Sequence, residues 1–150
     1  MNFKLISHRG NINGPNKDLE NNPEHLNKIL ESYDCEVDLR YSENRSQFYL
    51  GHDEPQYKVD LEWVIKNKNK LWIHCKDFSS LNILNKNNYD LNYFWHDKDL
   101  FTLTSKGFIW TYPGQKVESK SVVVLRDNDS LPVGAYGICS DNLEFIRNID

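Results

Sequence analysis

The sequence lacks long hydrophobic runs and lacks any excess of positive charge. No segment approaches the roughly 20 consecutive apolar residues that a membrane-spanning helix needs, and the segment after Gly10 is too polar for a signal peptide. The formal net charge is −4, with acidic and basic residues interspersed along the chain. The sequence therefore predicts no basic surface for nucleic acid or an anionic membrane, and it predicts a cytoplasmic protein without a transmembrane segment.

Cysteine and alanine are also scarce. The three cysteines, Cys35, Cys75 and Cys139, are an odd number, and no two of them form a Cys-x-x-Cys pair. Each lies in an apolar segment that we predict to be a strand, so we expect buried, reduced thiols rather than a disulfide framework. Ala135 is the only alanine, which we interpret as genomic composition. Because no repeat or low-complexity linker divides the chain, its length predicts one domain, residues 1–150.

The first predicted strand ends in the tripeptide His8-Arg9-Gly10. Histidine can transfer a proton near neutral pH, arginine presents a planar fork of donors to phosphate oxygens, and glycine allows a close backbone approach. The ends of buried strands are where α/β folds hold their ligands. The tripeptide therefore indicates an anion site, although a polar strand end without a ligand also fits it.

Two later predicted strands carry ionisable residues. In residues 35–40, period-two alternation places Glu36, Asp38 and Arg40 on one face. Neighbouring carboxylates repel each other unless a cation or several donors lie between them, so Glu36-x-Asp38 indicates part of a metal site. The apolar segment 48–50 leads to Gly51-His52-Asp53, which supplies a second imidazole at a strand end.

In this order, His8-Arg9-Gly10, Glu20-Asn21, Glu36-x-Asp38 and His52-Asp53 resemble the motifs of the glycerophosphodiester phosphodiesterase family. The wider superfamily also contains phosphoinositide phospholipases C and spider-toxin phospholipases D. Two further segments extend the resemblance. Residues 71–76, Leu-Trp-Ile-His-Cys-Lys, stand where the family has a strand carrying Glu-x-Lys, and residues 137–141 resemble the family's last strand, which usually ends in Thr-Asp.

The resemblance implies an α/β fold of the TIM type, a (β/α)8 barrel. Such barrels usually need about 200 residues or more, and the predicted strands after residue 93 follow one another with little room for helices. Short links fit a barrel better than a doubly wound sheet, whose crossovers each need about a dozen residues. We therefore expect a compact (β/α)8 barrel with several outer helices shortened or missing. The uncovered apolar surface of such a barrel also predicts a homodimer.

The sequence departs from the family pattern at two motifs. The family surrounds its Glu-Asn with proline and threonine, whereas Leu19 and Asn22 flank the pair here. The third metal-binding carboxylate of the family is replaced by His74, and imidazole suits Mn²⁺, Fe²⁺ or Zn²⁺ better than Mg²⁺ or Ca²⁺. Three readings of His74 stay open: the metal differs, water or Asp77 fills the third position, or His74 is hydrogen-bonded internally and no metal binds.

The resemblance implies metal-dependent cleavage of a small phosphodiester by a pair of histidines acting as acid and base. The cofactor would be one divalent ion, Mg²⁺, Ca²⁺ or Mn²⁺. Zn²⁺ or Fe²⁺ is also possible because of the imidazole of His74. His8 and His52 are the expected catalytic residues, and Arg9 and Lys76 are expected to bind the phosphate. The expected metal ligands are Glu36, Asp38, His74 and Glu20.

Two alternatives share the same residues. The chain could be a non-catalytic module that binds a phosphorylated ligand, or a lyase of the superfamily that stops at a cyclic phosphate. His96 and the aromatic residues Trp95, Trp110 and Tyr112 follow or end predicted strands and could line the cavity. We expect helices at residues 22–30, 60–65, 79–84 and 142–149, and we assign His25 to the first of them rather than to the site.

Overall fold

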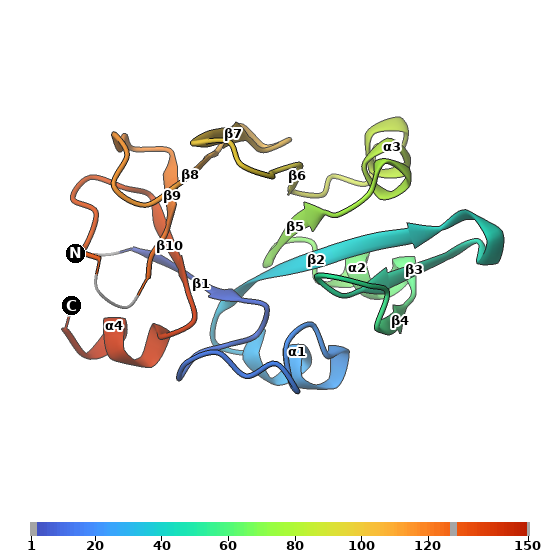
Figure 1. Ribbon diagram of the computed structural model, residues 1–150, viewed down its shortest axis with the longest axis horizontal. Coiled ribbons are helices and arrows are strands. Elements are labelled where there is room, and N and C mark those ends of the chain that lie inside the picture. Colours follow the sequence, from blue (N-terminus) through green and yellow to red (C-terminus); the bar gives the residue numbers. More distant parts are fainter. Residues whose placement is uncertain (1–2, 127–128, 150) are drawn as a thin grey trace.

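The computed structural model describes residues 3–126 and 129–149, and within them ten strands alternate with a few short helices (Figure 1). The elements, in chain order, are β1 (Lys4–His8), α1 (Pro23–Ile29), β2 (Asp34–Ser42), the 3-10 helix η1 (Glu43–Arg45), β3 (Gln47–Leu50), β4 (Tyr57–Val59), α2 (Leu61–Lys66), β5 (Leu71–Cys75), α3 (Phe78–Lys86), β6 (Tyr93–Phe94), β7 (Phe101–Leu103), β8 (Ile109–Thr111), β9 (Ser121–Val124), β10 (Gly137–Ser140) and α4 (Leu143–Ile149).

The expected (β/α)8 barrel is wrong. The strands form one curled mixed sheet, a half-barrel, with the order β4-β3-β2-β1-β10-β9-β8-β7 and with β5 pairing with β2 and β6. The β2–β3, β3–β4 and β7–β8 ladders are antiparallel, and the others are parallel. In the described ranges no helix lies between β6 and β10, because these connections have no helical spacing of apolar residues. The chain therefore cannot place a helix after each strand.

The two ends of the curl meet through side chains and loops. The rings of Phe94 on β6 and Trp110 on β8 stack with centroids 4.6 Å apart. The backbone N–H of Ser105 donates to the carbonyl oxygen of Tyr93 at 2.8 Å. Among the described residues no strand ladder joins β6 to β7. Packing of the aromatic rings and the hydrogen bonds between Ser105 and Tyr93 hold this side together.

A small core fills the inside of the curl, and a larger one lies outside it. The inner core takes one buried residue from each of six strands: Ile6, Trp72, Phe94, Trp110, Val122 and Cys139. The outer core packs β2, β3 and β5 against the helices. The three cysteines are buried and carry free thiols, as expected from the sequence.

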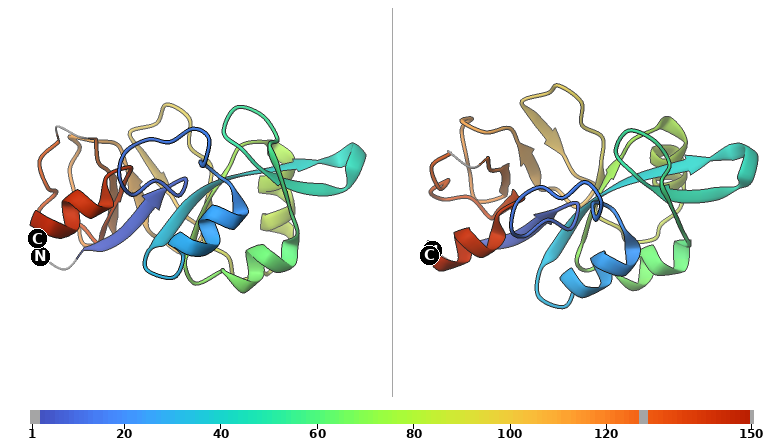
Figure 2. Two further views of the ribbon diagram at one scale, coloured as in Figure 1. Left: turned by 90° about the horizontal axis from the view of Figure 1, so that it is seen from below. Right: turned by 60° about the horizontal axis from the view of Figure 1, so that its bottom comes forward.

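The helices lie on the outside of the curl. Figure 2 shows α1 and α2 side by side next to β2, where Trp63 Nε1 donates to Asn27 Oδ1 at 2.8 Å. Helix α1 begins as predicted, because the side chain of Asn22 accepts hydrogen bonds from the first turn. Helix α3 begins at Phe78 with Asp77 as its cap, whereas the sequence predicted Ser79 as the cap, two residues later. None of the described helices has the length and the apolar character that crossing a membrane requires.

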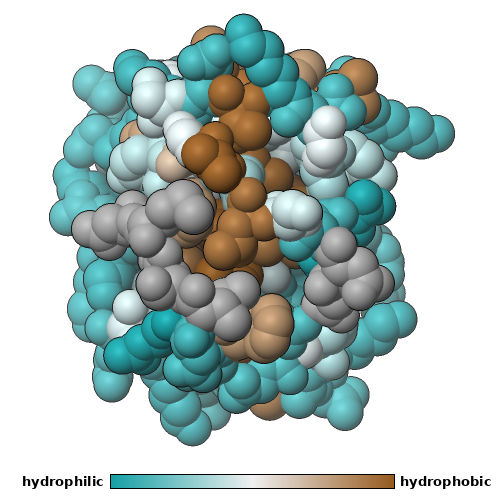
Figure 3. Space-filling view, turned by 90° about the vertical axis from the view of Figure 1, so that its left-hand side faces the viewer, coloured by the Kyte–Doolittle hydropathy of each residue, from teal (hydrophilic) through white to brown (hydrophobic). Residues whose placement is uncertain are grey.

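Helix α4 covers only part of the sheet next to β9 and β10. Figure 3 shows a hydrophobic strip on this side of the molecule, and a cavity of about 510 Å³ lies between Leu125, Leu131 and the α4 residues Phe145 and Ile146. The side chain of Phe145 is 63% exposed. The homodimer expected from uncovered apolar surface stays a prediction.

Strand β2 lies between β1 and β5 and fixes the register of the polar residues. In the parallel ladders His8 is paired with Glu36, and Asp38 is paired with His74. Residue Asp38 also accepts, through its carbonyl oxygen, the backbone N–H of Gly51 at 3.0 Å. The ends of β1, β2, β3 and β5 therefore meet at one place.

Candidate functional site

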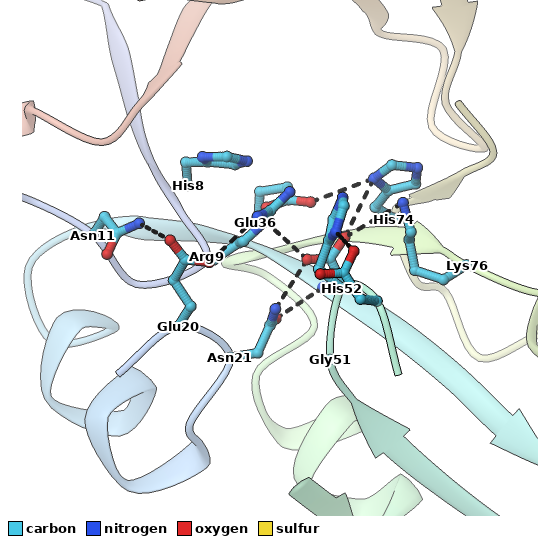
Figure 4. A network of polar contacts seen from close by, with 12 residues as sticks. His8, Arg9, Asn11, Glu20, Asn21, Glu36, Gly51, His52, His74 and Lys76 are labelled. Atoms are coloured by element: carbon cyan, nitrogen blue, oxygen red, sulfur yellow. Dashed lines mark hydrogen bonds and ion pairs between the residues drawn. The ribbon is translucent and has the colours of Figure 1, made fainter. Parts of the chain in front are cut away.

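Two carboxylates on β2 form the centre of the candidate site, and Figure 4 shows one of them, Glu36, among the other polar side chains. The side chains of Glu36 and Asp38 are buried, at 2% and 0% exposed. Glu36 Oε2 and Asp38 Oδ1 accept no hydrogen bond from the described residues. Asp38 Oδ2 accepts a hydrogen bond from Asn21 Nδ2 at 2.9 Å and lies 3.0 Å from Arg9 Nε. Buried carboxylate oxygens that accept no hydrogen bond are costly unless positive charge lies close to them.

The environment acts differently on the two carboxylates. Burial raises the pKa of both, but for Glu36 the imidazoles of His74 and His8 and the guanidinium of Arg9 prevail and lower its pKa. For Asp38, burial and the charge of Glu36 prevail and raise its pKa. Glu36 is therefore ionised. Ionisation of Asp38 adds a second negative charge to the pair and is favourable only when positive charge is near.

The imidazole of His74 faces both carboxylates. Its Nδ1 lies 3.6 Å from Glu36 Oε1 and 3.5 Å from Asp38 Oδ1. Its Nε2 lies 2.8 Å from the carbonyl oxygen of His96, and its ring stacks on Phe94. The three residues offer ligand atoms that all lie within 4.8 Å of one another. The structure thus places His74 where the resemblance predicts the third metal ligand.

The alternative third ligand, Asp77, is engaged elsewhere. Its Oδ1 accepts the backbone N–H of Ser80 at 2.7 Å, which caps α3, and its Oδ2 accepts the backbone N–H of Tyr41 at 3.0 Å. Both oxygens are therefore used in holding the start of α3 against β2. Asp77 is a structural residue in this arrangement.

Glu20 is not brought into the group formed by the other expected ligands. Its Oε2 lies 3.3 Å from Arg9 Nη1, and its Oε1 accepts a hydrogen bond from Asn11 Nδ2 at 3.0 Å (Figure 4). Arg9 has φ +57° and Gly10 has φ +94°, a tight turn that directs the guanidinium between Glu20 and Asp38. Glu20 thus orients the predicted phosphate-binding arginine.

The other predicted phosphate-binding residue, Lys76, follows β5. Its Nζ lies 4.0 Å from Asp38 Oδ1, and its backbone N–H donates to the carbonyl oxygen of Leu39 at 2.9 Å. Arg9 and Lys76 therefore approach the same carboxylate from different strands. Their placement puts two fixed positive charges beside the candidate metal ligands.

His8 is paired with an aspartate that sequence reasoning did not assign to it. His8 Nδ1 lies 2.8 Å from Asp141 Oδ1, and Asn11 Nδ2 donates to the same oxygen at 2.8 Å. Burial lowers the pKa of His8, but Asp141 and Glu36 prevail and raise it. The only sequence signal was the polar end of the last strand, and the pairing of β1 with β10 was needed to connect it to His8.

His52 is held at the other side of the site by two less obvious residues. Gly51 has φ +152°, and a Cβ at this position would lie 2.0 Å from the carbonyl oxygen of Glu54. Arg40 Nε donates to the carbonyl oxygen of Gly51 at 2.9 Å, and Arg40 Nη2 donates to that of His52. His52 Nδ1 lies 2.6 Å from Asp53 Oδ1. Sequence alternation placed Arg40 on the correct face but did not predict this role.

Most of the site residues line one cavity of about 350 Å³, and Asp38 and Glu20 are not among its lining residues. Strands β1, β2 and β5 and the segment after β3 supply a polar wall, and β8, β9 and the segment after β8 supply a largely apolar wall. The polar wall includes His8, Arg9, Glu36, His52, His74 and Lys76, and the apolar wall includes Trp110, Tyr112, Pro113 and Val124. His96 also lines the cavity, as the sequence analysis allowed, whereas Trp95 does not.

A scan against protein-family models and searches of the curated proteins and of the solved structures found no match to this chain. The functional argument therefore depends on the residues and their geometry.

Proposed function

We propose that this chain is a metal-dependent phosphodiesterase that cleaves a small glycerophosphodiester-like substrate. The observation that carries this proposal is that the histidines of two histidine–aspartate pairs line one cavity together with Glu36, whose buried carboxylate lies beside that of Asp38. The resemblance of the His8, Glu36 and His52 motifs to the glycerophosphodiester phosphodiesterase family supports the same reaction. Both acid–base groups and the charge-stabilising groups are then within reach of one bound phosphate.

Glu36, Asp38 and His74 would hold the divalent cation. Glu36 Oε2 and Asp38 Oδ1 accept no hydrogen bond from the described residues, which fits this assignment, because a cation would satisfy them. When bound, such an ion polarises a non-bridging phosphate oxygen and offsets negative charge. The remaining steps belong to the protein's own side chains.

Arg9 and Lys76 bind and orient the phosphate. Arg9 is already held by Glu20 and Asp38, so little side-chain entropy is lost when its guanidinium meets an anion. Lys76 supplies a compact charge on the side of β5. Fixed positive groups of this kind stabilise charge that develops in the transition state.

His8 and His52 move the protons. The raised pKa of His8 favours its protonated form near neutral pH, which suits the acid that protonates the leaving alkoxide. His52 then removes the proton from the attacking hydroxyl or water, with Asp53 fixing the orientation of its ring. The apolar wall with Trp110 and Val124 excludes water from one side of the reacting group.

One observation favours a second candidate, a phosphate-binding module without catalysis. Arg9, His74 and Lys76 all lie within 4.0 Å of Asp38. If His74 is protonated, these three cations balance the two carboxylates without a metal ion. A module of this kind would bind phosphate and show no dependence on divalent cations.

Hydrolysis assays test the proposal directly. The metal-stripped protein is supplied in turn with Mg²⁺, Ca²⁺, Mn²⁺ and Zn²⁺, and bis(p-nitrophenyl) phosphate and glycerophosphodiesters serve as substrates. We expect turnover that depends on the metal and that His8→Ala and His52→Ala abolish, while Asp60→Asn, which changes an exposed side chain outside the cavity, retains it. Product analysis separates hydrolysis from formation of a cyclic phosphate. Absence of turnover with every metal, in a folded protein that binds phosphate, would establish the binding module instead.

A further inference from the structure

We propose that the cation site of this chain is a mixed oxygen and nitrogen site that takes Mn²⁺, Fe²⁺, Co²⁺ or Zn²⁺ in preference to Mg²⁺ or Ca²⁺. Its third ligand atom is Nδ1 of His74, beside the carboxylates of Glu36 and Asp38. The inference rests on the proposed function, because it identifies the class of cation for the same site.

The hydrogen bond to His96 fixes which nitrogen of His74 can bind a metal. A backbone carbonyl oxygen can only accept, so Nε2 of His74, at 2.8 Å from the oxygen of His96, carries the proton. In the neutral ring Nδ1 then presents a lone pair. Hydrogen bonds of this kind from the remote ring nitrogen are a regular feature of metal-binding histidines.

The orientation of the ring is fixed from two directions. The ring of Phe94 stacks on that of His74 at 5.1 Å between centroids, with 15° between the planes. The β2–β5 ladder pairs His74 with Asp38, which holds the imidazole on the same side of the sheet as the carboxylates. Nδ1 is thus directed at the carboxylates before any ligand arrives.

The distances between the ligand atoms are compatible with a four-coordinate ion, and the number and type of the ligands argue against Ca²⁺. Nδ1 lies 3.6 Å from Glu36 Oε1 and 3.5 Å from Asp38 Oδ1. Two ligands bound to a tetrahedral ion at about 2.1 Å are separated by roughly 3.4 Å. Ca²⁺ prefers bonds of about 2.3 to 2.6 Å to six or more oxygens, which a three-residue site with one nitrogen does not supply.

The charge of the surroundings favours the same class of ion. Arg9 Nε lies 3.0 Å from Asp38 Oδ2, and Lys76 Nζ lies 4.0 Å from Asp38 Oδ1. These two cations offset much of the charge of the carboxylate pair, and Mg²⁺ and Ca²⁺ are bound chiefly by negative charge on oxygen. An imidazole nitrogen adds affinity for the first-row transition ions without adding charge.

Cation binding to the metal-stripped protein tests this inference without any substrate. Titration calorimetry with each ion gives affinities, and the visible absorption of Co²⁺ reports a nitrogen ligand. We expect the wild-type protein to bind Co²⁺ and Zn²⁺ more tightly than Mg²⁺ and Ca²⁺. Outer partners of metal ligands are worth about 10- to 100-fold in affinity, and a direct ligand at least as much, so His74→Gln should weaken Co²⁺ and Zn²⁺ binding by roughly tenfold or more.

Two further variants complete the test. His74→Glu replaces the nitrogen by an oxygen ligand and should shift the preference toward Mg²⁺ and Ca²⁺, whereas Asp60→Asn, an exposed change outside the group of ligands, should leave every affinity unchanged. Because these variants depend on folding, Co²⁺ is also added to the wild-type protein with ¹⁵N-labelled histidine. We expect paramagnetic shifts that are largest at Nδ1 of His74.

The outcomes separate this inference from the proposed function. Tight Co²⁺ and Zn²⁺ binding that requires His74, in a protein that hydrolyses no phosphodiester, would support the inference and remove the proposed function. Hydrolysis sustained best by Mg²⁺, with His74→Gln leaving cation affinities unchanged, would overturn the inference and leave the proposed function standing. Absence of binding by any divalent cation would overturn the inference as well.

Discussion

His8 Nδ1 and Asp141 Oδ1 lie 2.8 Å apart, although 133 positions separate the two residues in the chain. Each residue comes directly after a paired position of the parallel β1–β10 ladder, Ser7 and Ser140. The first and last strands along the chain, β1 and β10, therefore meet at an acid–base pair. The side chains are 26% and 27% exposed, so the interaction is only partly screened by solvent.

The His8 and Asp141 pair should make stability depend on pH. The pKa of His8 is raised, because Asp141 and Glu36 prevail over burial. The pair therefore stabilises the folded state fully below the ordinary histidine pKa of about 6.5, and this contribution is lost as the pH rises through the raised value. Asp141→Asn should lower the free energy of unfolding by about 1 kcal/mol near pH 5.5 and by less near pH 8.5.

Urea denaturation at both pH values measures this difference, and NMR titration of the imidazole should show a lower pKa for His8 in the variant. Asp60→Asn serves as the control, because it removes one exposed negative charge next to α2. A loss of stability that is the same at both pH values would contradict the predicted charge interaction.

Gly51 should tolerate a methyl group far less well than another glycine with positive φ. Both Gly51 and Gly107 have positive φ, but a Cβ on Gly51 would lie 2.0 Å from the carbonyl oxygen of Glu54, whereas a Cβ on Gly107 would have no neighbour within 4 Å. Gly107→Ala should cost about 1 kcal/mol of unfolding free energy, the usual penalty of a left-handed residue. Gly51→Ala should cost about 3 kcal/mol or more and lower turnover by displacing His52.

Chemical denaturation and phosphodiester hydrolysis of the two alanine variants are compared. Equal losses of stability in the two variants would show that the turn at Gly51 relaxes around the methyl group.

Arg40 should act on turnover through the backbone that carries His52. Its guanidinium donates to the carbonyl oxygens of Gly51 and His52, and lysine cannot form both bonds in the same geometry. Because small displacements of a catalytic group are costly, Arg40→Lys should lower kcat by roughly tenfold or more and leave the affinity for Co²⁺ unchanged.

Arg45→Lys is the matched control, since Arg45 lies in the exposed η1 turn and contacts only Tyr49 among the described hydrogen-bond partners. If Arg40→Lys weakened Co²⁺ binding as much as it lowered kcat, Arg40 would be a general structural support rather than a positioning residue.

Glu20 should affect the binding of phosphate rather than of the cation. Its carboxylate contacts Arg9 and Asn11 and is absent from the group formed by Glu36, Asp38 and His74. Glu20→Gln removes a charged partner of Arg9, so KM for a phosphodiester should rise several-fold while the affinity for Co²⁺ stays unchanged. Glu24→Gln, in the exposed first turn of α1, is the control. A roughly tenfold loss of Co²⁺ affinity in Glu20→Gln would instead make Glu20 a metal ligand, as the sequence resemblance implied.

The sequence predicted well those parts of the site that depend on local geometry. Alternation along β2 placed Glu36 and Asp38 on one face, and the same rule applied to residues 71–75 placed His74 toward them. The start of α1 followed from Asn22 and Pro23. Each of these predictions requires only the conformation of a few consecutive residues.

Features that depend on strand pairing were not predictable in the same way. The family resemblance and the short links between predicted strands suggested a (β/α)8 barrel. In the structure β3 and β4 form an antiparallel extension of β2, while β5 pairs with the first part of β2. The partner of His8 required the β1–β10 ladder. The role of Glu20 required the turn at Arg9, whose positive φ is unusual for a residue other than glycine.

The antiparallel return of the chain along β2 and β3 also determines where this protein can be labelled. The chain leaves the site after Asp38, turns at η1 and comes back to Gly51, where the backbone N–H donates to the carbonyl oxygen of Asp38. Figure 1 shows this hairpin extending away from the rest of the sheet. Residues inserted at the tip, 43–46, lengthen a loop whose two ends are already fixed to each other. A fluorophore or an affinity sequence placed there would be attached to the strands that carry the site and would leave the distance between Asp38 and His52 unchanged.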